Sequence, residues 1–195
     1  MQNDHNYPIR KYIRLRGFDY SNTGFYFITI NIQSRLCLFG NIINGKMILN
    51  DAGRMIENWY YELESKFPNT RCHEMVVMPD HFHCIIENVM VAHVGAPLRG
   101  RPLPNHQRPL PNNEHKHPKT NYGINNKKTN ATIGDAVRWF KTMTTNEYIQ
   151  GVKQNGWQRF DRILWQRNFF DHIIRNEESY IEKTEYIKNN PQNWP

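Results

Sequence analysis

The chain has 195 residues and lacks the features that would place it in a membrane or outside a cell. No apolar run approaches the roughly 20 residues that a helix needs to cross a bilayer, so we expect no membrane partner. Residues 1–17 show no apolar stretch after their charges, and we therefore expect no signal peptide. Only three cysteines are present, and none forms a CxxC pair. This argues against a zinc ribbon or a disulfide framework and favours a reduced, cytoplasmic setting.

Acidic residues are almost missing from one stretch, residues 91–131. Seven Lys or Arg residues and one acid, Glu114, give it a net charge of +6, out of +7 for the whole chain. It also holds six of the eleven prolines and two copies of RPLPN, at 101–105 and 108–112. Such a composition cannot bury enough apolar surface to offset the entropy cost of ordering. We expect a disordered basic insert within a single domain that spans 1–195. A solvated linker and a segment that contacts nucleic acid phosphates are both open interpretations.

Outside the insert, the apolar periodicity alternates between the two-residue period of strands and the longer period of helices. The strands are expected at 24–32, 45–50, 71–78, 81–89 and 162–174. Helices are expected to begin at Asn50 or Asp51, at Thr132 and near 176, where residues that can cap a helix precede apolar stripes. This order predicts an α+β fold with a ferredoxin-like (RRM-like) antiparallel sheet and helices on one face.

The stretch MPDHFHCII contains two histidines on one predicted strand. Alternate side chains of a strand share a face, so Phe82 and Cys84 face the core while His81 and His83 lie on the other side. The two imidazoles are then roughly 6.5–7 Å apart and can converge on one ion. Imidazole is the commonest transition-metal ligand in proteins. An HxH pair alone is a weak signal, since packing or surface histidines are the commoner explanation, and a metal also needs a third ligand.

The last predicted helix offers a polar group at the right spacing. Tyr186 and Asn190 are four residues apart, so they lie on the same flank of the helix. The face expected to pack on the sheet consists of Tyr180, Ile181, Thr184 and Ile187. Tyr186 is then at the edge of the core. An interfacial tyrosine and a helix-capping asparagine are the structural alternative.

Together these motifs resemble a known family. MPDHFH at 78–83, WQRNFFDHIIRNEESY at 165–180 and the terminal Y-x-x-x-N-P that starts at Tyr186 are similar to the HUH single-tyrosine transposases. The chain looks most like the REP-associated tyrosine transposases and their insertion-sequence relatives. LNDAGRMI at 49–56 has the same likeness. The resemblance runs from about residue 17 to 194, interrupted by the insert.

The resemblance implies a DNA transposase that cleaves and rejoins single-stranded hairpin DNA through a 5′-phosphotyrosine. Tyr186 would be the nucleophile, and His81, His83 and Asn190 would hold Mg²⁺ or Mn²⁺. Relatives often have glutamine at the third position, which leaves direct coordination by Asn190 open. Many relatives also have asparagine where this chain has Asp80, a tolerable departure that could bias the tautomer of His81. The resemblance allows a monomer or a homodimer, and it implies a cytoplasmic, nucleoid-associated protein.

Several basic and aromatic residues are candidates for binding DNA. They are Arg10, Lys11, Arg14 and Arg16 in a basic arm, and Arg167, His172 and Arg175 near the last expected strand. A solvated arm and a structural strand histidine are the simpler explanations. Two other classes of function remain open: a non-catalytic nucleic-acid-binding domain of ferredoxin-like fold, and a zinc-dependent hydrolase. Only the tyrosine mechanism would leave a covalent DNA adduct.

Overall fold

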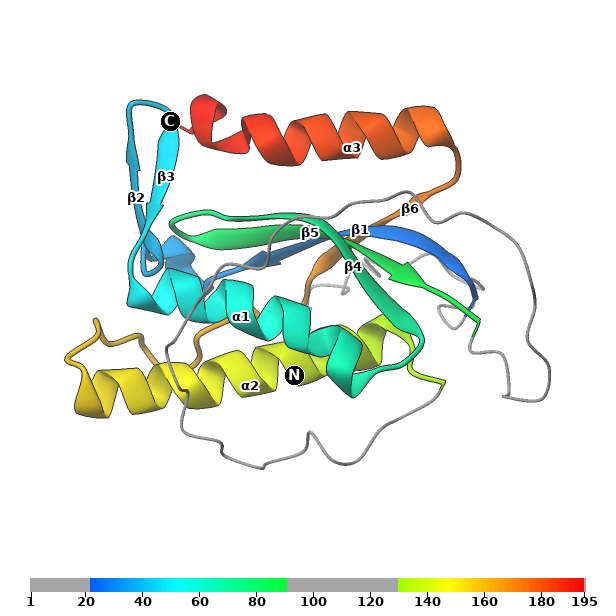
Figure 1. Cartoon of the computed structure of the whole chain (residues 1–195). Helices are drawn as coiled ribbons and strands as arrows, with labels where there is room; N and C mark the ends of the chain where they lie inside the picture. Colours follow the sequence, from blue (N-terminus) through cyan, green and yellow to red (C-terminus); the bar gives the residue numbers. More distant parts are fainter. Residues whose placement is uncertain (1–21, 91–129, 195) are drawn as a thin grey trace, which may run out of the picture.

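The computed structural model describes residues 22–90 and 130–194 (Figure 1). The basic arm and nearly all of the predicted insert lie outside these residues. The described elements are β1 (Gly24–Asn31), β2 (Gly40–Ile43), β3 (Lys46–Leu49), α1 (Asp51–Lys66), β4 (Thr70–Val77), β5 (His81–Asn88), α2 (Ile133–Gln154), β6 (Phe170–Ile174) and α3 (Glu177–Asn189), with short 3-10 turns η1 (Gln33–Arg35) and η2 (Asn190–Asn193). None of the helices in these two ranges combines the length and apolarity that a bilayer crossing needs.

Four strands form one antiparallel sheet in the order β4-β5-β1-β6. The chain is therefore α+β with helices packed on an antiparallel sheet, which confirms the predicted fold class. A separate hairpin joins β2 to β3. Its turn contains Asn44 and Gly45, whose positive φ angles of 50° and 71° are those of an Asn-Gly hairpin turn.

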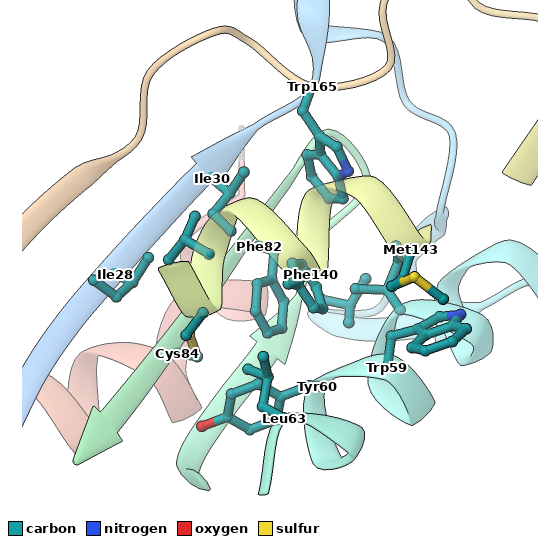
Figure 2. Close-up of a cluster of buried hydrophobic side chains, with 14 of the residues drawn as sticks. Ile28, Ile30, Trp59, Tyr60, Leu63, Phe82, Cys84, Phe140, Met143 and Trp165 are labelled. Atoms are coloured by element: carbon teal, nitrogen blue, oxygen red, sulfur yellow. The ribbon is translucent and has the colours of Figure 1, made fainter. Parts of the chain in front are cut away.

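Helices α1 and α2 cover one face of the sheet and enclose the main core (Figure 1). The alternation in β5 directs Phe82 and Cys84 into this core, as predicted, where the Phe82 ring stacks on Phe140 of α2 at 5.2 Å (Figure 2). Both helices begin at expected caps, because the side chain of Asn50 accepts from the Gly53 amide and Thr132 forms a capping box with Asp135.

Helix α3 lies across the opposite face, which departs from the expectation that all helices share one face (Figure 1). It covers a smaller apolar cluster of Ile85, Ile174 and Ile187. Ile181, expected to pack on the sheet, is instead 54% exposed. The inner face of α3 carries Lys183 in its place, with the ammonium 6.0 Å from the Phe27 ring. The sheet is thus buried on both sides.

The strand prediction differs from the structure in two places. The prediction missed β2, because GNII is short and alternates weakly. The strand expected at 162–174 is regular only from Phe170, while the preceding residues form a loop with one isolated bridge between Trp165 and Ile32. Trp165 is buried in the core by contact with both helix and sheet, so its hydrophobicity reflects packing and not strand formation.

Candidate functional site

Both histidines of β5 face α3, on the side of the sheet away from the main core. In the register with β1, His83 is opposite Thr29 and His81 is opposite Asn31. The two rings are nearly perpendicular, with centroids 4.6 Å apart, and both side chains are buried. The predicted placement of the pair on one face is therefore confirmed.

Each imidazole is oriented through its Nδ1 atom. The Asp80 carboxylate accepts a hydrogen bond from Nδ1 of His81 at 2.6 Å, and its second oxygen lies 2.7 Å from Nε of Arg35. Nδ1 of His83 shares a hydrogen bond with Thr29 Oγ1 at 2.8 Å. These bonds leave Nε2 as the nitrogen of each ring that could face an ion.

Burial keeps both imidazoles neutral. It lowers the pKa of His83 to about 3, with further lowering by the neighbouring His81 and Arg35. Burial also lowers the pKa of His81, although hydrogen bonding to Asp80 opposes this change. Neutral imidazole is the form that ligates metals. The environment therefore suits metal ligation without the cost of removing a proton.

Asp80 is held in place by the backbone around it. The Pro79–Asp80 corner connects β4 to β5, and its carbonyls accept from the amides of Ile32, Leu38 and Phe39. Arg35 reaches the carboxylate from the turn after β1, where it adopts a left-handed backbone with φ 56°. Left-handed backbone in a non-glycine residue is unfavourable and marks a conformation imposed by its surroundings.

The end of α3 brings Tyr186 and Asn190 to the histidines. The Tyr186 ring lies edge-on to His83 at 5.3 Å and to Phe27 at 5.8 Å between centroids, and its side chain is 49% exposed. Asn190 is buried beside His81, and its side chain acts to raise the pKa of that imidazole. Trp194, just after η2, stacks on the other side of the His81 ring at 5.8 Å. The structure thus gathers all four predicted site residues.

Tyr180, the other tyrosine of α3, lies at a distance from this cluster along the same face. Its hydroxyl is 3.1 Å from Nδ1 of His73, whose Nε2 is 3.1 Å from Glu87. Its ring packs on Phe25, whereas that of Tyr186 packs on Phe27. Burial and nearby carboxylates raise the pKa of Tyr180, which disfavours its phenolate.

Among the described residues, no group of three His, Cys, Asp or Glu side chains could hold an ion. A metal at this site would therefore depend on two imidazoles and the amide oxygen of Asn190. The oriented, neutral imidazoles and the buried amide fit such a role.

The other residues predicted to contact DNA lie at scattered positions outside the cluster of His81, His83, Tyr186 and Asn190. Arg167 is exposed in the loop before β6, and Arg175 is exposed between β6 and α3. His172 is exposed on β6 opposite Phe27, so it shares the face that α3 covers. Arg10, Lys11, Arg14 and Arg16 lie outside the described residues.

A relative of known sequence matches nearly the whole chain. It is an uncharacterized protein of Haemophilus influenzae, 39% identical over 189 residues, which cover 95% of this chain and 89% of the relative. The chain belongs to the family of this Haemophilus protein. No family model matches it.

Two solved structures also resemble this chain. A REP-associated tyrosine transposase bound to a REP hairpin is 18% identical, with a TM-score of 0.48 over 86% of this chain and 66% of that one. This chain thus spans slightly less than two thirds of the transposase's length. A candidate transposase from Deinococcus radiodurans R1 is 13% identical, with a TM-score of 0.44 over 93% of this chain and 98% of that one.

The sequence-based prediction did not include several residues that shape the site in this chain. Thr29 supports His83, Arg35 holds Asp80, and Trp194 covers His81. The alternation along β1 could have placed Thr29 on the face of Phe27. Nothing local marks Arg35 or Trp194, because each meets the histidines only through the tertiary fold.

Proposed function

We propose that this protein is a DNA transposase that cleaves and rejoins single-stranded hairpin DNA through a covalent bond to Tyr186. The observation that carries this proposal is the position of Tyr186, whose half-exposed ring lies beside His83 at the point where Asn190 contacts His81. The same four residues carry the motif resemblance to HUH single-tyrosine transposases. A non-catalytic nucleic-acid-binding domain would have no need for this convergence.

The chemistry would be a transesterification at phosphorus. The Tyr186 oxygen forms a bond to the phosphorus as its proton leaves to solvent, and the bond from phosphorus to the 3′ oxygen breaks. The 3′ oxygen takes up a proton and leaves as a hydroxyl, while the 5′ phosphate remains on the tyrosine. A 3′-hydroxyl from another DNA end can reverse the step and release the enzyme. The bond energy is conserved in the phosphotyrosine, so joining needs no nucleotide cofactor.

The chain's own residues orient the attacking tyrosine and the two imidazoles. Helix α3 holds Tyr186 against Phe27 and His83, which restricts the ring while leaving part of it open to solvent. Asp80 and Thr29 fix the two imidazoles. His81, His83 and Asn190 would hold a divalent cation, Mg²⁺ or Mn²⁺, which when bound would polarise the scissile phosphate and offset charge developing on its oxygens.

The decisive experiment compares two tyrosines of one helix. Wild-type protein incubated with single-stranded hairpin DNA and Mg²⁺ or Mn²⁺ should give a protein–DNA species that survives denaturation. Tyr186→Phe should give none, since it removes the attacking oxygen, and its stability should change by less than about 0.5 kcal/mol because the side chain is half exposed. Tyr180→Phe is the matched control and should still form the adduct.

Peptide mapping of the adduct identifies the nucleophile directly. The modified peptide should contain Tyr186. An adduct on Tyr180, or one that persists in Tyr186→Phe, would show that another oxygen attacks. Absence of any adduct across a panel of hairpins, despite tight binding, would refute the transposase proposal and leave a nucleic-acid-binding protein.

A further inference from the structure

A groove of about 730 Å³ runs between α2 and the loop that precedes β6. One wall is a single flank of α2 that includes Arg138, Lys141 and Asn146. The other wall is formed by the residues of the 160–169 loop other than Asp161 and Gln166. The cluster around His81 does not include any of these residues. The groove is therefore a second surface, separate from the candidate site.

The charged side chains that line the groove all carry the same sign. They are Arg138, Lys141, Arg162 and Arg167, and no Asp or Glu is found among the described residues that form its walls. Just outside the wall, Asp135 lies 3.3 Å from Arg138, and both side chains of that pair have access to solvent. Pairs of this kind are weak in water, so Arg138 can exchange its partner. The groove thus presents a concentrated positive charge to an anionic ligand.

The lining of the groove also includes apolar and aromatic residues. It includes the rings of Phe160, Trp165 and Phe169, while Thr142 and Asn146 supply neutral polar groups on the helix side. Surfaces that bind single-stranded nucleic acid combine cations for the phosphates with rings on which bases stack. A ligand with negative charge but no planar groups, such as a polyglutamate peptide, would not stack on these aromatic rings.

The loop wall is held in a specific and strained shape. Arg162 has a positive φ of 58°, in a tight turn where the Ile163 amide donates to the Asp161 carbonyl at 2.6 Å. The Lys141 ammonium donates to the carbonyls of Gln166 and Arg167, which ties the loop to α2. Burial lowers the pKa of Lys141 to about 8, but the side chain still carries a charge at neutral pH. Its ammonium is engaged by the loop carbonyls, which leaves the arginines to meet a ligand. Strain of this kind at a surface loop often marks a functional position.

The loop that walls the groove is tied to the end of β1 beside His81, while α2 and the histidines lie on opposite faces of the sheet (Figure 1). The Gln166 amide donates to the carbonyl of Asn31 at 2.9 Å, and Asn31 is directly opposite His81 in the sheet. Arg167, the next residue, therefore lies one strand away from the candidate site. A DNA strand that leaves the site around the end of β1 would meet Arg167 first and then the rest of the groove on the α2 side of the sheet.

The chain's own undescribed segments do not suit this groove. Residues 91–129 carry seven basic residues and one acid, and residues 1–21 carry four basic residues and two acids. Both segments are positive, so the groove would repel them. Charge complementarity points to an external polyanion.

We propose that this groove binds a single-stranded stretch of DNA that flanks the hairpin. Arg138, Arg162 and Arg167 would contact its phosphates, and its bases would lie against Phe160 and Phe169. The inference rests on the proposed function for the identity of the DNA, but the groove's binding needs neither Tyr186 nor a metal.

The test measures binding without chemistry. All proteins carry Tyr186→Phe, and EDTA is present. Fluorescence anisotropy compares a blunt DNA hairpin with the same hairpin bearing an oligothymidine tail of roughly 12 nucleotides, a length that single-strand sites cover. Arg162→Gln combined with Arg167→Gln should weaken binding of the tailed hairpin about tenfold and leave the blunt hairpin within about twofold. The slope of log binding constant against log salt concentration should become shallower by about 1.4, because two phosphate contacts on a single strand are lost.

The matched control is Lys153→Gln. This residue is exposed on the same helix and does not line the groove, so its loss should affect both hairpins equally and weakly. An equal loss for the tailed and blunt hairpins in the double variant would overturn the proposal. So would a tail effect as large in Lys153→Gln, or competition by polyglutamate as effective as by oligothymidine.

Crosslinking adds a readout that does not depend on affinity. Iododeoxyuridine in the tail should crosslink to a peptide that contains Phe160 or Phe169, and a crosslink confined to other peptides would contradict the assignment. Failure of the Tyr186 adduct with a retained tail effect would refute only the transposase chemistry. A normal adduct without a tail effect would refute only the groove.

Discussion

Asp80 illustrates how one side chain can fix the orientation of a histidine. Its carboxylate is buried and bridges Nδ1 of His81 and the guanidinium of Arg35, so the negative charge is paired on both sides. A carboxylate behind a ligating histidine fixes the ring and its tautomer. The ring also stacks on Trp194 and lies edge-on to His83, so rotation would disrupt both contacts.

We therefore predict that Asp80→Ala lowers Mn²⁺ affinity about 10- to 100-fold, the range found when such supporting groups are removed. Isothermal titration calorimetry with Mn²⁺ measures this without any DNA. Asp80→Asn should retain more affinity, because its amide oxygen can still accept from His81. Unchanged Mn²⁺ affinity in Asp80→Ala, with the same melting temperature as wild type, would show that Asp80 does not orient a ligand.

At the scale of elements, α1 must approach the β2–β3 hairpin closely. Gly53 sits in the first turn of the helix, and a Cβ built there would lie 2.3 Å from the Phe39 carbonyl oxygen and 2.8 Å from Leu49 Cδ2. The first of these contacts is with backbone, which cannot move aside cheaply. The glycine is therefore required by the packing of helix on hairpin, and not by helix formation itself.

Gly53→Ala should consequently destabilise the protein, although the same change in an open helix stabilises by about 1 kcal/mol. We expect a loss of about 1–3 kcal/mol, typical of overpacking, in chemical denaturation. Glu62→Ala, later in the same helix and exposed, serves as a control and should change stability by less than about 0.5 kcal/mol. A Gly53→Ala protein at least as stable as wild type would mean that α1 can shift away from the hairpin.

At the scale of the whole molecule, the two described parts of the chain are in contact at the residues that flank the basic segment. The Asn69 side chain donates to Asn88 Oδ1 at 2.5 Å and to the Ala131 carbonyl at 2.8 Å. Asn88 ends β5, and Ala131 precedes α2. One buried amide therefore joins the residues on both sides of the insert, so a short connection can span the gap.

Replacing residues 95–128 with a short Gly-Ser linker should thus leave the fold intact. The sheet, both helix layers and the Asn69 bridge lie outside the deleted range, and loop length affects stability only weakly. A cooperative thermal melt within a few degrees of wild type is the expected result. A larger drop would indicate that the insert packs on the domain.

Much of the local structure is determined by the sequence alone. The two-residue period puts His81 and His83 on one face and Phe82 on the other, and the caps at Asn50 and Thr132 begin their helices. The spacing of four between Tyr186 and Asn190 places both on one flank. These features depend on neighbours within a few residues, so the covalent spacing and the backbone period are sufficient to predict them.

The tertiary structure alone decides which flank meets which partner. It places α3 on the second face of the sheet, where Tyr186 reaches His83 and Ile181 remains exposed. It also sets Arg35 against Asp80 and holds the 160–169 loop over α2 to form the basic groove. These contacts join residues far apart in the chain. Their geometry follows from the competition of all apolar surfaces for burial, which no local pattern encodes.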